Sequence, residues 1–140
     1  GIAHPQGSMS VYQDSGQVYH ALGQLKEMTA WLADLHKSKQ ITESAFNELG
    51  WQTKDFYDRV SCDIEIFEAL ETEKLHGAGP AFHKFQSVMK SLEGLNQSEA
   101  LDSQVYAVHR HVEMLRVQIA EQQAAQAALE AQQNEEDDSF

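Results

Sequence analysis

The spacing of apolar residues constrains this chain more than any other feature of its sequence. Over residues 17–39 they recur every three or four positions, which places them on one face of a helix. They are Val18, Leu22, Leu25, Met28, Leu32 and Leu35. No stretch alternates apolar and polar residues over strand length, and no Asn-Gly or Asp-Gly hairpin signal occurs. The sequence therefore predicts an all-α protein.

Residues typical of helix ends predict where the first helices begin and stop. Asp14 or Ser15 is suited to cap the first helix, since a short polar side chain can accept a bond from a free backbone N–H. Thr42 is expected to cap a short second helix that Gly50 ends. Thr53 is the expected cap of the longer helix that follows.

The remaining helices are expected to be long, because Pro80 is the only proline beyond residue 8. The helix from Thr53 should end at Gly77, and the next should have Pro80 in its first turn. A last helix should run from about Glu99 into the 130s. Nine residues are predicted to form the core of one bundle: Leu25, Leu32, Phe56, Val60, Phe67, Phe85, Met89, Val112 and Leu115.

The last predicted helix changes character midway. Its first half carries a three-four apolar seam, formed by Val105, Val108, Val112, Leu115 and Ile119. Continuing the same register reaches mostly glutamine, although alanines keep the helix propensity high. The prediction is an up-and-down helical bundle of about four longer helices over residues 9–116. A long C-terminal helix, residues 117–134, projects from it. The seam is expected to pack inside the bundle, with a possible homodimer as the alternative.

Length and composition are those of a single domain. At 140 residues the chain can bury one modest core. The first eight residues, "GIAHPQGS", are interpreted as an appended remnant before a natural start at Met9. Cys62 is the only cysteine, and the acids beside it should raise its pKa, so we expect an inert thiol. Without a disulfide pair or an apolar run near 18 residues, a cytoplasmic protein with no membrane contact is predicted.

Negative charge is concentrated at the end of the chain. No basic residue follows Arg116, and six of the 22 acidic residues do, so they carry half of the net charge of −12. Such a balance disfavours direct binding of nucleic acid or of an anionic membrane. The opposite idea, an acidic mimic of DNA that inhibits a DNA-binding protein, stays open as an alternative. It requires the carboxylates of residues 55–73 to form one continuous exposed stripe.

The sequence contains no arrangement that indicates catalysis or a metal site. A di-iron bundle needs two Glu-x-x-His pairs, and Glu73-x-x-His76 is the only one. His109 and Glu113, four residues apart, are more typical of an ion pair. Neither a catalytic residue, a metal ligand nor a cofactor is therefore assigned. Asp63 is expected to face the core or its edge, and an alternative function is a small-molecule or metal-binding helical bundle that uses this carboxylate and nearby histidines.

The chain ends in "EEDDSF", four acids followed by Ser139 and Phe140. This ending resembles the C-terminal tip of bacterial and phage single-stranded-DNA-binding proteins, although serine stands where those proteins have proline before the phenylalanine. The resemblance implies that the ring enters an apolar pocket while basic groups hold the acids. It covers six residues only. Residues 135–140 are predicted to form an acidic disordered tail.

The function predicted from these features is protein binding. We expect a non-catalytic adaptor, chaperone or inhibitor whose partner is another protein. Its contacts would be the projecting helix, an exposed tryptophan and the tail. The assigned partner-binding residues are Trp31, Glu135, Glu136, Asp137, Asp138 and Phe140.

Overall fold

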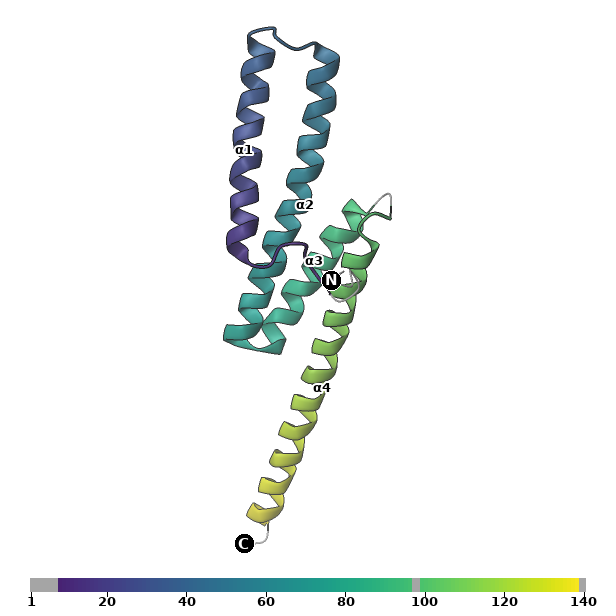
Figure 1. Cartoon of the computed structure of the whole chain (residues 1–140). Helices are drawn as coiled ribbons and strands as arrows, with labels where there is room; N and C mark the ends of the chain where they lie inside the picture. Colours follow the sequence, from purple (N-terminus) through teal and green to yellow (C-terminus); the bar gives the residue numbers. More distant parts are fainter. Residues whose placement is uncertain (1–7, 97–98, 139–140) are drawn as a thin grey trace.

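Four helices joined by short connections make up the computed structural model of this protein, which describes residues 8–96 and 99–138. They are α1 (Ser15–Lys37), α2 (Glu43–His76), α3 (Ala78–Leu95) and α4 (Asp102–Asp138). No strand occurs within the described ranges. The all-α prediction is confirmed. Figure 1 shows α1 and α2 as a hairpin at one end and α4 extending to the other.

The predicted caps of the first two helices are confirmed. Asp14 caps α1, and its Oδ1 accepts a hydrogen bond from the backbone N–H of Gln17 at 2.9 Å. The Oγ1 of Thr42 caps α2 in the same way, with the N–H of Ala45 at 3.1 Å. Gly77 ends α2 with φ of 84°, a left-handed conformation that glycine adopts without steric cost.

The predicted break at Gly50 is wrong, because α2 runs unbroken from Glu43 to His76. A glycine inside a helix costs only about 1 kcal/mol relative to alanine, and the surrounding turns tolerate it. Thr53 is not a cap either. Its hydroxyl lies in the middle of the helix and donates to the carbonyl oxygen of Leu49 at 2.7 Å.

The apolar core is divided into two clusters rather than the single one expected. In α2, Val60, Ile64 and Phe67 belong to a small cluster with Val18 and Leu25 of α1. The larger cluster is formed by residues on the opposite side of α2 together with α3, α4 and part of the N-terminal segment. Its buried members are Cys62, Ile66, Ala69, Ala78, Ala81, Phe85, Val88, Leu92, Leu101, Val108, Val112 and Leu115.

The helices pack in chain order: α1 against α2, α2 against α3, and α3 against α4. In the hairpin formed by α1 and the first half of α2, the two helices therefore pack only against each other, and no third helix covers them. Phe56, which was predicted to be a core residue, lies in this hairpin and is 55% exposed. Phe67 and Met89 are half-buried, and the other six are buried. A two-helix layer has no third element to cover Phe56.

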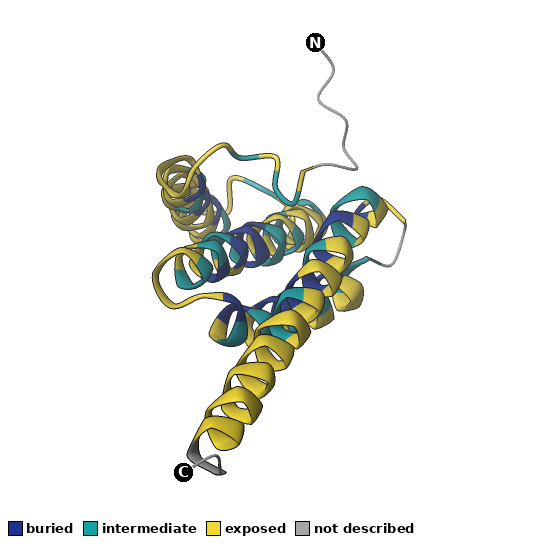
Figure 2. Ribbon diagram, turned by 90° about the horizontal axis from the view of Figure 1, so that it is seen from below, coloured by how far each residue is buried: buried dark blue, intermediate teal, exposed yellow. Residues whose placement is uncertain are grey.

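The seam in the first half of α4 packs inside the fold, as expected. Val108, Val112 and Leu115 are fully buried against α3, and Val105 and Ile119 are half-buried beside them. The second half extends past α3, and Figure 2 shows it as exposed along its length. The helix thus changes from packed to solvent-surrounded where its sequence changes from valine and leucine to alanine and glutamine.

Candidate functional site

The projecting half of α4 is the first candidate surface. Every residue from 120 to 136 is exposed, and the two large apolar side chains nearby, Val117 and Leu129, are 55% and 57% exposed. Glu135 and Glu136 are exposed near its end. The backbone of Asp137 and Asp138 continues the helix. Phe140, the predicted docking residue, lies outside the described residues, as does Ser139.

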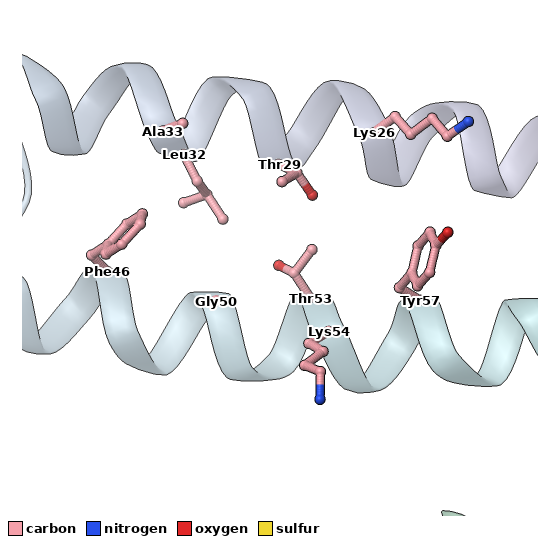
Figure 3. Close-up of a pocket in the computed structure, with 9 residues that line it drawn as sticks. All are labelled: Lys26, Thr29, Leu32, Ala33, Phe46, Gly50, Thr53, Lys54 and Tyr57. Atoms are coloured by element: carbon pink, nitrogen blue, oxygen red, sulfur yellow. The ribbon is translucent and has the colours of Figure 1, made fainter.

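The second candidate surface is a groove of about 440 Å³ between α1 and α2. Small residues of both helices line it, Thr29 and Ala33 on α1 and Gly50 and Thr53 on α2, and Leu32 points into the space between the helices (Figure 3). Residues of this size leave space between the two helices that larger side chains would fill. We call this the hairpin groove; it is lined by Lys26, Thr29, Leu32, Ala33, Phe46, Gly50, Thr53, Lys54 and Tyr57.

Two aromatic residues stand at the ends of the hairpin groove. Phe46 and Tyr57 both come from α2, and both rings are directed toward α1 in Figure 3. The Phe46 ring stacks on His36 of α1, with centroids 3.9 Å apart and planes 8° from parallel. His36 in turn shares a 2.6 Å hydrogen bond with Glu43. One end wall is therefore held in place from both helices.

The rim of the hairpin groove is basic. Lys26 lies on α1 and Lys54 on α2, so the two helices each contribute one ammonium group (Figure 3). Both residues are exposed, and neither forms an ion pair within the part of the chain that the structure describes. Lys54 extends away from the space between the helices in this view, but its four-carbon stem is flexible. Lys26 therefore places one ammonium group beside the groove, and the Lys54 ammonium can reach the rim by rotation of its stem; neither has an ion-pair partner in the described residues.

Exposed aromatic side chains surround the hairpin as well. Trp31 on α1 is 61% exposed, and Trp51, one residue after the groove-lining Gly50, is 76% exposed. The structure does not bring Trp31 together with the acidic residues of the tail, because α1 lies at one end of the molecule and the C-terminal end of α4 at the other (Figure 1). The predicted contact residues therefore form two separate surfaces.

Asp63 is buried, as the sequence predicted. It is 5% exposed, and its Oδ1 accepts a hydrogen bond from Gln104 Nε2 of α4 at 2.8 Å. The same amide group donates to the carbonyl oxygen of Met9 at 2.7 Å, so Gln104 ties the N-terminal segment to both helices. Burial raises the pKa of Asp63, and hydrogen bonds from Ser10 and Gln104 partly oppose this. The carboxyl group fastens elements of the fold together.

The other titratable groups singled out in the sequence also have structural partners. Glu73 forms a hydrogen bond with His111 of α4 instead of sharing a site with His76. The expected pair of His109 and Glu113 is not formed, and Arg116 lies 3.6 Å from the Glu113 carboxylate. No group of three or more His, Cys, Asp or Glu side chains suited to a metal ion occurs within residues 8–96 and 99–138.

The lone thiol, Cys62, is buried. Cys62 is 4% exposed in the larger core. Burial first, and then the charges of Glu65, Asp63 and Asp58, raise the pKa of Cys62 to about 11. The protonated form is a poor nucleophile.

No protein-family model, curated protein or solved structure shows significant similarity to this chain. Of the helices that the structure describes, none is long and apolar enough to cross a membrane.

Reasoning from the sequence missed the hairpin groove. Gly50 and Thr53 were interpreted as a helix stop and a helix cap, which removed them from any helical face. Their spacing of three residues in one continuous helix places both residues on the same face, toward α1. Thr29 and Ala33, four residues apart on α1, carried the matching signal.

Proposed function

We propose that this protein is a non-catalytic binding protein, an adaptor, chaperone or inhibitor, that contacts another protein through its helical surface and its acidic C-terminal end. The observation that carries the proposal is the projecting half of α4. Helix stability in proteins comes mostly from packing an apolar face, and this segment has none to pack. It holds the acidic end well away from the core (Figure 1).

The chemistry of that end suits protein contact. Clustered acids attract a basic surface at long range, and this attraction weakens as salt screens it. Phe140 supplies an aromatic side chain, whose burial in a pocket contributes on the order of 2 kcal/mol. The acids thus favour encounter, and the ring provides the buried anchor.

The alternative functions receive less support. The hydrogen-bond partners of Asp63 are Gln104 and Ser10, and no histidine is among them within the described residues. The acidic DNA mimic requires a continuous carboxylate stripe on α2. Three of those carboxylates are engaged within the fold, since Asp63 is buried, Asp55 pairs with Arg59 at 3.2 Å and Glu73 bonds to His111.

A capture experiment tests the proposed function. Immobilised full-length chain, a chain lacking residues 117–140 and a chain lacking only Phe140 are exposed to extract of the source cells. We expect the full chain to retain a partner that the truncated chain does not. The partner, once purified, should bind the Phe140 deletion at least tenfold more weakly, because the anchor is lost. Circular dichroism of each variant controls for folding.

Equal retention of the same proteins by all three chains would contradict the proposal. Changing Glu135 and Glu136 to Gln provides a second readout, since it should mainly flatten the dependence of affinity on salt while the ring remains.

A further inference from the structure

The hairpin groove and the acidic end of α4 are complementary in chemistry. The groove has an apolar floor, two aromatic end walls and two lysines at its rim. The C-terminal end carries four consecutive acids followed, after one serine, by a phenylalanine. An apolar cavity with unpaired positive charge is the site that an acidic segment with an aromatic anchor requires.

The dimensions agree with such an occupant. Phe46 and Tyr57 are eleven residues apart on one helix, which separates the end walls by about 16 Å at 1.5 Å per residue. That length accepts about three turns of a helix, or about five extended residues at 3.3 Å each. Glu136, Asp137 and Asp138 belong to α4, so at 1.5 Å per residue they span about 4.5 Å, and the groove is long enough for them and the two residues that follow.

A chain cannot fill its own groove. The groove lies in the hairpin of α1 and α2, whereas α4 extends from the core toward the opposite end of the molecule (Figure 1). A helix of 37 residues is about 55 Å long and does not fold back on itself. The occupant must therefore come from another molecule.

A second copy of the chain meets this requirement in a closed arrangement. Because groove and acidic end lie at opposite ends of the molecule, two copies side by side and antiparallel would place each acidic end beside the partner's groove. Twofold symmetry makes the two contacts identical and leaves no site open for further growth. We propose that the hairpin groove is a binding site for the acidic C-terminal segment, residues 135–140, of a second copy of this chain, which forms a dimer by reciprocal exchange. This inference rests on the proposed role of the C-terminal end as a docking segment, and it names the receptor.

Sedimentation of the full chain over a range of concentrations tests the proposal. The parent should dimerise, with an affinity that falls as salt is added. Deleting Phe140, or changing Lys26→Glu together with Lys54→Glu, should each weaken dimerisation at least tenfold. The matched control is Lys84→Glu with Lys90→Glu, two exposed lysines of α3 outside the groove. It changes the net charge equally and should leave the dimer intact.

A charge exchange gives a stricter test. The first partner is the chain with Lys26→Glu and Lys54→Glu, and the second carries Lys at all four acidic positions: Glu135→Lys, Glu136→Lys, Asp137→Lys and Asp138→Lys. Each alone sets like charges against each other in both contacts and should stay monomeric. Mixed one to one, they pair opposite charges in both contacts and should form a heterodimer.

Three results would overturn the inference: a parent that is monomeric at all concentrations, a dimer that survives deletion of Phe140, or a mixture that does not associate. The proposed function is judged separately. A monomeric parent that still captures a partner only when its C-terminal end is present would overturn the groove assignment and leave the docking role of that end standing. A dimer that exchanges as described but captures no other protein would uphold the groove and contradict the adaptor.

Discussion

Phe85 is the side chain whose removal tests the division of the core most directly. It lies in α3, is fully buried in the larger cluster, and meets the His111 ring edge-on with centroids 4.6 Å apart. A buried phenylalanine contributes through its own transfer from water and through the cavity that its loss leaves in a rigid surround. We therefore expect Phe85→Ala to lower the free energy of unfolding by about 3–5 kcal/mol.

The same chemical change at two other positions supplies internal controls. Phe67 is half-buried in the small cluster between α1 and α2, so Phe67→Ala should cost less, about 1–3 kcal/mol. Phe56 is 55% exposed, and Phe56→Ala should change stability by no more than about 0.5 kcal/mol. The order of the three losses should follow burial and not position along the chain.

Urea unfolding followed by the helical circular dichroism signal measures all three. The slope of stability against urea should stay unchanged, which shows that the losses arise in the folded state. A loss at Phe85 below about 1 kcal/mol, or a loss at Phe56 equal to that at Phe85, would refute the division into a large core and a thin hairpin.

The remaining predictions concern charge, reactivity and the seam. Because the pKa of Asp63 is raised above the ordinary 3.8, its contribution to stability is greatest below that pH and is lost as the pH rises through the raised value. Asp63→Asn keeps an oxygen acceptor, so unfolding measured across pH should lose this dependence, with no loss of stability at neutral pH. Cys62 should react with a thiol reagent at neutral pH only as fast as the protein unfolds; prompt reaction of the native protein would contradict its burial. Changing Val112 and Ile119 to Lys together should abolish the helical signal, whereas a folded monomer would show that the seam is dispensable inside the fold.

The sequence alone determined the secondary structure and most of the helix ends. An apolar period of three to four residues is a property of the chain itself, so α1 and the seam of α4 were predicted correctly. Capping is local too, and Asp14, Thr42 and Gly77 act as their residue types suggest. The predicted helix end at Gly50 was wrong, because a glycine ends a helix or lies within one depending on the packing of the chain around it.

The buried face of an amphipathic helix can also be read from periodicity. Asp63 was expected in the core, and it lies there. The hydrogen-bond partner of Asp63 was not predictable from the sequence. Gln104 is 41 residues away, and its amide reaches Asp63 only because of how α4 packs in the folded protein. The partner of Glu73 was missed for the same reason, since His111 belongs to another helix.

The order of helix packing was decided by tertiary structure alone. A stripe of apolar residues shows that one face of a helix is buried, but it does not show which helix packs against that face. α2 has two such faces, one packed against α1 and the other against α3. That choice leaves the hairpin without a third helix, so Phe56 is exposed and the small residues Ala33 and Gly50 border a groove instead of a contact. A sequence records side-chain size and polarity, whereas an empty space exists only between elements that have already been placed.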